Sequence, residues 1–144
     1  MELRCVKAGP GDWHYLMALR KSTMVEHLEI AGIFLTDEQH AERLASDYDC
    51  SNILLLDDVP IGTLKLKEQA HQWDILQLQI HPDFQGQGIG ALILNRLISM
   101  AKNNGVRLFL TVLKANPAAK FYVKSGFEFC GEDRHEFHMC LSPS

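Results

Sequence analysis

The chain has 144 residues, 47% of them hydrophobic and 22% charged, which suits one globular domain (residues 1–144) with a core of its own. It contains no run of about 18 apolar residues and no basic start followed by an apolar segment, so we expect a cytoplasmic protein with no membrane partner. The formal net charge is -4 at pH 7, yet the charges are unevenly distributed along the chain.

The first half of the chain predicts one strand, two helices and then three strands. In chain order these are strand 2–7, helices 12–28 and 36–48, and strands 51–58, 61–68 and 73–81. We expect a turn at Val59 and Pro60. The alternation LKLK at 64–67 predicts a strand with one face in solvent. Pro82 should end the last of these strands, because proline has no N–H to donate.

The second half of the chain predicts two helices among three strands. In chain order these are helix 88–104, strand 106–113, helix 116–126, and strands 127–131 and 135–141. Asn116 and Pro117 suit the start of the second helix, while Gly105 and Gly126 suit the two helix ends. The resulting order, β-α-α-β-β-β-α-β-α-β-β, indicates an α/β (α+β) fold.

The stretch QGQGIG lies between a predicted strand and a long predicted helix. It comprises Gln85, Gly86, Gln87, Gly88, Ile89 and Gly90. The first turn of a helix has N–H groups without intrahelical partners and the positive end of the helix dipole, and glycine allows an anion to approach them closely. A tight turn without a ligand would account for one glycine but poorly for three. We therefore predict a phosphate-binding turn.

The charge distribution supports an anionic ligand in this part of the chain. Residues 84–127 contain six of the fourteen cations and no carboxylate. Scattered surface lysines are the ordinary explanation for such an excess, but this segment also contains the glycines. No GK[ST] sequence follows the glycines, which excludes a Walker-type loop. A dinucleotide site would need an acidic residue about 20 positions on, and none occurs before Glu128.

Two segments together resemble the diagnostic motifs of the GNAT superfamily of acyl-CoA N-acyltransferases. The first comprises ILQLQI and HPDFQGQGIGALIL, which fit the pattern Q/R-x-x-G-x-G/A, and the second is NPAAKFYVKSGF, with a Tyr before Gly-Phe. The resemblance covers essentially the whole chain, and RKSTMVEHLE is similar to an uncharacterised bacterial branch of the family. It implies a GNAT-like fold, in which helices flank a central mixed, mostly antiparallel sheet.

The resemblance also implies roles for individual residues. The turn at 85–90 would bind the pyrophosphate of the donor, acetyl-CoA, and the backbone of Leu78, Gln79 and Ile80 would pair with its pantetheine arm, with the Ile80 N–H holding the oxyanion. Asn116 would contact the pantetheine, although a helix cap alone would also explain it. Tyr122 would protonate the departing thiolate, although an aromatic residue of this kind is often only part of the core.

The resemblance implies an N-acetyltransferase whose acceptor is a primary amine of a small molecule or a peptide, attacking directly in a ternary complex. Many family members place a Glu on the strand before the glycine turn to deprotonate the amine, but Gln77 and Gln79 occupy that strand here. Glu26, His27, His81 or a water chain could replace it. Because this carboxylate is missing, a non-catalytic acyl-CoA-binding sensor remains an alternative function.

An acidic stretch precedes the strands and bears on the acceptor. Residues 26–49 contain seven carboxylates and Arg43 as the only Lys or Arg. In the family's fold the first two helices line the acceptor cleft, so we predict a cationic amine acceptor, with a solvated acidic face as the alternative.

The sequence favours neither a metal site nor a nucleic-acid partner. His135 and His138 lie three apart on a predicted strand, so they point to opposite faces. No CxxC pair is present, and the four cysteines are expected to be reduced and mostly buried. The cations lack the interleaved aromatic residues of a base-stacking surface. The oligomeric state, a homodimer included, is left open.

Overall fold

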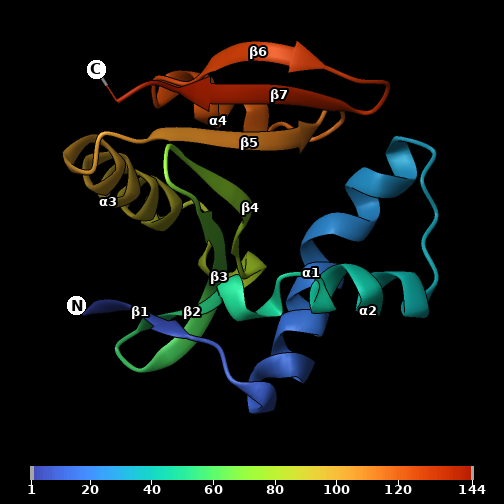
Figure 1. The fold of residues 1–144 in the computed structure, drawn as a ribbon. Helices are drawn as coiled ribbons and strands as arrows, with labels where there is room; N and C mark the ends of the chain where they lie inside the picture. Colours follow the sequence, from blue (N-terminus) through green and yellow to red (C-terminus); the bar gives the residue numbers. More distant parts are fainter. Residues whose placement is uncertain (1, 144) are drawn as a thin grey trace.

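A computed structural model describes residues 2–143 and shows a seven-stranded sheet in that range, with helices on both faces (Figure 1). The strands are β1 Leu3–Lys7, β2 Ser51–Leu56, β3 Val59–Glu68, β4 Gln72–Ile80, β5 Arg107–Leu113, β6 Glu128–Glu132 and β7 Glu136–Leu141. The helices are α1 Trp13–Ile30, α2 Asp37–Ala45, α3 Ile89–Asn103 and α4 Ala118–Lys124. The predicted α/β class and element order are confirmed.

The strands lie in the order β1-β2-β3-β4-β5-β7-β6. Every neighbouring pair is antiparallel except β4 and β5, which are parallel, so the sheet is mixed and mostly antiparallel as expected. The β4–β5 ladder joins only residues 72–75 to residues 107–110. Directly after this ladder, the β3–β4 pairing has a bulge at Leu76. From there on, β4 and β5 run apart (Figure 1).

The two faces of the sheet have separate hydrophobic cores. The larger core joins α3 and α4 to the sheet through residues such as Leu94, Leu110 and Met139. The smaller core joins α1 and α2 to β2 through Leu16, Leu44 and Ile53. Helices α1 and α2 therefore lie on the opposite face from α3 (Figure 1).

The prediction of a solvent-exposed face on β3 holds at Lys67, whose side chain is 43% exposed, but is wrong at Lys65, which the end of α2 covers. Lys65 is only 3% exposed. Its ammonium group donates to the carbonyl oxygens of Leu44, at 3.3 Å, and of Ser46. The last carbonyls of a helix have no intrahelical partner, so the buried lysine satisfies them and ties the end of α2 to the sheet.

Two local expectations also differ from the structure. The β2–β3 turn falls on Asp57 and Asp58 rather than on Val59 and Pro60; both aspartates have positive φ, 49° and 66°, as a tight two-residue hairpin turn requires. The four cysteines are unpaired as expected, but none is buried. Cys5 and Cys130 are exposed because β1 and β6 are the edge strands of the sheet.

A buried polar pair connects α1 to α2. Arg20 and His40 are 3% and 4% exposed, and the Nε–H of Arg20 donates to Nδ1 of His40 at 3.1 Å. Since a guanidinium cannot accept a hydrogen bond, this contact requires His40 Nδ1 to be unprotonated. Burial and, secondarily, the charge of Arg20 lower the pKa of His40.

This pair predicts a loss of stability in mild acid. The lowered pKa of His40 in the folded state means that the unfolded chain, whose histidines titrate near ~6.5, takes up the proton first as pH falls. The His40 contribution is therefore complete above about pH 6.5 and is lost as pH falls below that value. Melting temperatures from about pH 8 to about pH 5 should fall more steeply for the wild type than for His40→Gln. Parallel curves would contradict this assignment.

Candidate active site

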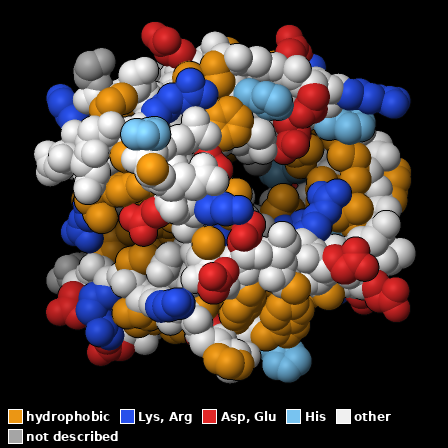
Figure 2. All heavy atoms as spheres, in the orientation of Figure 1, with side chains coloured by type: hydrophobic (Ala, Val, Ile, Leu, Met, Phe, Trp, Pro, Cys, Tyr) orange, Lys and Arg blue, Asp and Glu red, His pale blue; other side chains and the backbone are white. Residues whose placement is uncertain are grey.

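The gap between β4 and β5 forms the floor of a cleft of about 520 Å³. Helix α1 contributes Thr23, Met24 and His27 to its wall, α4 contributes Tyr122, and β7 contributes Glu136. Figure 2 shows a hollow in this face, between the β5–β7 part of the sheet and helices α1 and α2. The cleft therefore brings together residues from five elements of the chain, namely α1, β4, β5, α4 and β7.

The backbone of β4 is partly unpaired along this cleft. The N–H of His81 donates to the carbonyl of Ile61 on β3 at 2.7 Å. Because backbone groups point to alternate sides along a strand, those of Ile80 and Leu78 face away from β3, into the gap, while those of Gln79 face β3. Gln79 thus differs from the expectation: its side chain, not its backbone, reaches the cleft.

The Ile80 carbonyl already has a partner. It accepts a hydrogen bond from the side chain of Gln85 at 2.9 Å, which ties the start of the glycine turn to the end of β4. The Ile80 N–H, together with the backbone of Leu78, is left to meet a ligand. This geometry is that of a sheet edge open to strand addition.

Gly62 on β3 sets the position of this part of β4, and sequence reasoning missed it. A Cβ atom at Gly62 would lie 2.3 Å from the carbonyl oxygen of Gln79, closer than real atoms approach. Only glycine therefore allows β3 to approach β4 this closely. The sequence signal was an isolated glycine in a strand pattern, which often marks a close backbone approach.

The backbone conformation of the turn itself requires glycine at two of its three glycine positions, whether or not a ligand binds. Gly86 and Gly88 have φ of 76° and 79°, which L-residues rarely adopt, and Gly88 directly precedes α3. Gly90 has no such requirement. Residues 85–88 are exposed, whereas the side chain of Ile89 is buried in the core, so Ile89 can offer only its backbone N–H.

A matched pair of substitutions tests this turn. Gly88 and Gly105 sit just outside opposite ends of α3, both have positive φ, and a Cβ at either would meet open space. Alanine at each should lower stability by about 1 kcal/mol through backbone strain. Only Gly88→Ala should also weaken coenzyme A binding, measured by calorimetry. Equal coenzyme A affinity in the two folded variants would remove the turn from the ligand site.

Tyr122 combines a packed ring with a hydroxyl that faces the cleft. The residue is 7% exposed, and its ring contacts those of Phe121 and Phe127 edge-on, with centroids 5.3 and 5.6 Å away. Burial raises the pKa of the Tyr122 phenol to about 12. The hydroxyl is therefore protonated at any working pH and can donate a hydrogen bond into the cleft.

Asn116 lies in the cleft wall where β5 leads into α4. Its side-chain oxygen accepts from the N–H of Ala118, the first residue of α4, at 2.9 Å, although the N-cap position itself is Pro117 rather than Asn116 as predicted. The amide NH2 group remains available to the cleft, so a contact with a ligand is compatible with the capping bond.

The sequence matches the family model of the acetyltransferase (GNAT) domain over residues 23–143. The chain belongs to this family. It is also similar to a Bacillus subtilis (strain 168) protein whose provisional name describes it as an acetyltransferase, at 28% identity over 85% of this chain and 80% of that protein.

Solved structures share the fold of this GNAT domain. An acetyltransferase from Thermus thermophilus superposes with a TM-score of 0.77 at 24% identity, covering 99% of this chain and 97% of that one. The PaiA N-acetyltransferase from Thermoplasma acidophilum, crystallised with coenzyme A, has a TM-score of 0.74 at 21% identity, covering 99% of both chains. The GNAT-like fold expected from the motifs is therefore confirmed. Within residues 2–143, no helix has both the length and the apolar character needed to cross a membrane.

The structure separates the candidate bases of the GNAT domain. His27 lines the cleft, and its Nδ1 is buried without a hydrogen-bond partner among the described residues. Glu26 is exposed outside the cleft wall. His81 is also outside that wall, where its Nδ1 accepts from the N–H of Asp83 at 3.1 Å. The geometry thus favours His27 among the three side chains.

The acidic stretch at 26–49 does not supply the carboxylate of the cleft. Of the described residues that line the cleft, α1 contributes three and α2 contributes none. Asp37 pairs with Lys21 at 2.6 Å, and Asp47 lies 3.6 Å from Lys67. The carboxylate that lines the cleft is Glu136, which sequence reasoning missed because only the folded sheet brings β7 to this place.

The lysines and arginines of residues 84–127 do not gather at the glycine turn either. The Arg96 guanidinium reaches the carbonyl of Leu3 at 3.4 Å, and Lys102 lies in the last turn of α3. Lys114 pairs with Glu132. Lys120 and Lys124, on α4, take part in no ion pair within residues 2–143. The turn predicted to bind phosphate therefore offers its own backbone N–H groups rather than a cluster of cations.

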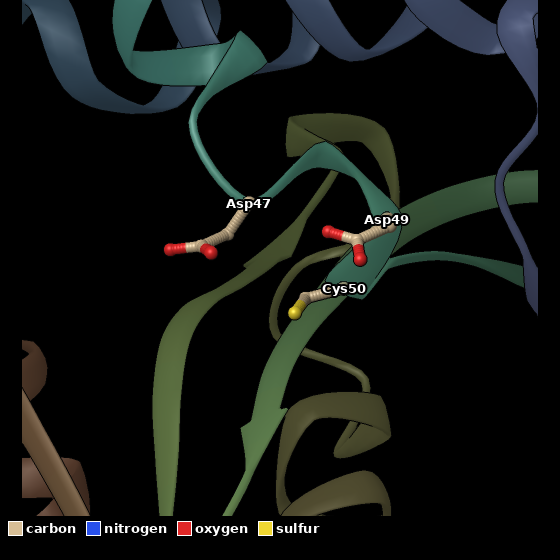
Figure 3. A group of neighbouring side chains, drawn as sticks. All are labelled: Asp47, Asp49 and Cys50. Atoms are coloured by element: carbon tan, nitrogen blue, oxygen red, sulfur yellow. The ribbon is translucent and has the colours of Figure 1, made fainter.

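Three potential metal ligands meet at the surface before β2. Atoms of Asp47, Asp49 and Cys50 lie within 4.8 Å of one another (Figure 3). The ammonium group of Lys67 already lies near the Asp47 carboxylate. An exposed acidic cluster balanced by a lysine is an ordinary surface arrangement, and it lies apart from the cleft residues.

Proposed function

We propose that this GNAT acetyltransferase transfers an acetyl group from acetyl-CoA to a primary amine of a small molecule or peptide, by direct attack in a ternary complex. The observation that carries the proposal is the meeting, in one cleft, of the unpaired β4 backbone with the hydroxyl of Tyr122. The β4 backbone can bind an extended acyl donor by hydrogen bonds, and the Tyr122 hydroxyl can donate a hydrogen bond to the sulfur that leaves. The glycine turn adjoins the same strand through Gln85.

Acetyl-CoA fits the chemistry of this site as the donor and supplies a thioester carbonyl. The exposed turn at 85–88 and the first N–H groups of α3 suit its pyrophosphate. The backbone of Leu78 suits the amide groups of the pantetheine arm, as in strand addition, because the Ile80 carbonyl is already bonded to Gln85. The Ile80 N–H is our candidate donor to the negative charge that develops on the carbonyl oxygen.

Tyr122 is placed to assist the departing sulfur. A phenol with a pKa of about 12 does not transfer its proton completely to a free thiolate, whose conjugate acid titrates near ~8.5. It does remain protonated and can donate a hydrogen bond as negative charge forms on sulfur. We therefore assign Tyr122 Oη to stabilisation of the leaving thiolate in the transition state by a donated hydrogen bond, while the proton given up by the attacking amine balances the charge of the released thiolate.

Replacement of Tyr122 by phenylalanine tests this role. The change keeps the ring that packs against Phe121 and Phe127 but removes the donor, so turnover should fall by roughly 10²–10⁴ with coenzyme A affinity nearly unchanged. Tyr15→Phe is the control, because it removes a buried hydroxyl outside the cleft wall and should leave activity per folded molecule intact. Full turnover in a folded Tyr122→Phe protein would show that another group or water stabilises the departing thiolate.

The sensor alternative rests on the absence of a carboxylate from the part of β4 that lines the cleft. Release of thiol from acetyl-CoA, measured against polyamines, amino acids, aminoglycosides and N-terminal peptides, distinguishes the two functions. An enzyme releases thiol with at least one amine. Tight acetyl-CoA binding with no release on any of them would favour the sensor.

A further inference from the structure

Glu136 gives the cleft a fixed negative charge. It is the only carboxylate among the described residues that line the cleft, and no lysine or arginine lines it. It lies opposite Leu113 in the β5–β7 ladder, three residues beyond the last β4–β5 pair. That distance is about 10 Å along a strand, so Glu136 lies where the gap has widened.

The Glu136 carboxylate is unpaired, although its neighbours in the same hairpin are paired. Glu132 forms an ion pair with Lys114, and Asp133 lies 3.0 Å from His138. No described residue forms an ion pair or hydrogen bond with the side chain of Glu136. A half-buried carboxylate without a partner in a cleft without cations favours a positively charged ligand.

Two hydrogen bonds hold the backbone of Glu136, so the main-chain position from which its carboxylate extends is fixed. Its N–H donates to the side chain of Asp133 at 2.8 Å, and its carbonyl accepts from the N–H of Asp133 at 2.9 Å. The Asp133 carboxylate also meets His138, and these contacts lower its pKa to about 2. Asp133 therefore stays ionised and keeps the turn closed throughout the working pH range.

The glutamines of β4 that line the cleft are polar but uncharged. The side-chain oxygen of Gln79 is buried and has no partner among the described residues. Gln77 lies on the α1 face of β4, where its amide is 4.0 Å from the sulfur of Met24. The side chains of Gln77 and Gln79 therefore add no charge to the cleft that would offset Glu136.

The chemistry of the transfer decides which charge Glu136 recognises. The reacting amine must be neutral to attack, and a carboxylate beside it would stabilise its protonated form. A carboxylate suits instead a second positive charge that stays protonated throughout. We propose that Glu136 is a specificity-determining residue that binds a second, non-reacting cationic group of the amine acceptor, which is then an aliphatic diamine or a polyamine. This inference rests on the proposed function.

Binding to the coenzyme A-saturated protein tests the inference without requiring turnover. The probes are α,ω-diamines of three to ten carbons and the amino alcohols of the same lengths, which replace one charge by a neutral hydroxyl. At its best length the wild type should bind the diamine roughly three- to tenfold more tightly than the amino alcohol. Glu136→Gln should abolish this preference. Added salt should reduce it in the wild type.

Two further variants control the experiment. Glu128→Gln removes the same charge from an exposed position of the same hairpin and should keep the preference. Glu136→Asp keeps the negative charge but shortens the side chain by one methylene, which moves the carboxylate away from the ligand. The diamine that binds most tightly should therefore be a longer one. Coenzyme A affinity should be unchanged in all three variants.

Three outcomes would overturn the inference: equal binding of diamine and amino alcohol by the wild type, no binding of any diamine, or a preference that survives in folded Glu136→Gln. These results are distinct from failure of the proposed function. An enzyme that acetylates monoamines and amino alcohols as well as diamines would retain the function without the role of Glu136. Failure to bind acetyl-CoA would remove the function itself.

Discussion

The short parallel pairing of β4 with β5 is the constraint on which the site depends. Four residue pairs hold the two strands together at one end, and the bulge at Leu76 coincides with the place where they part. Beyond that point Leu78 and Ile80 present backbone groups that the sheet itself does not use. Unpaired backbone near the centre of a sheet is costly unless water or a ligand meets it, so this divergence favours an extended ligand.

The same divergence separates two chemical environments. On the α3 side the glycine turn offers N–H groups and the positive end of the α3 dipole, with Gln85 joining the turn to Ile80. On the α1 side the cleft has amide groups from β4 and the carboxylate of Glu136, with no lysine or arginine among the described lining residues. An anionic donor and a cationic acceptor can thus approach from opposite faces without competing for one site.

Buried polar contacts hold α1 and α2 against each other and α2 against the sheet. Lys65 binds the last carbonyls of α2, and Arg20 donates to His40 between α1 and α2. Such contacts are directional, and breaking one leaves an unpaired buried group. They fix the wall from which Thr23, Met24 and His27 face the cleft. The geometry of that wall therefore depends on residues that do not themselves touch a ligand.

Local patterns in the sequence were enough to predict the elements, their order and the glycine turn. Helical spacing, the helix-end signals at Asn116 and Gly105, and the strand-ending Pro82 act within a few residues, so they can be read without the fold. Even there, the predicted position of the β2–β3 turn was wrong. The hairpin turn fell on Asp57 and Asp58, because their positive φ is selected by the strand pairing.

The tertiary structure decided which of these residues meet in the cleft and what surrounds them. Lys65 became buried only because α2 packs over β3, and Gln79 turned its backbone away from the gap because β3 pairs with it. Glu136 joined the cleft through a pairing of β5 with β7, which are more than twenty residues apart in the chain. Sequence by itself therefore determined the local conformations and the family's motifs, while long-range pairing and burial determined the chemical environment of the site. The reason is that hydrogen bonding within a turn or helix involves near neighbours, whereas charge, burial and access depend on every segment packed nearby.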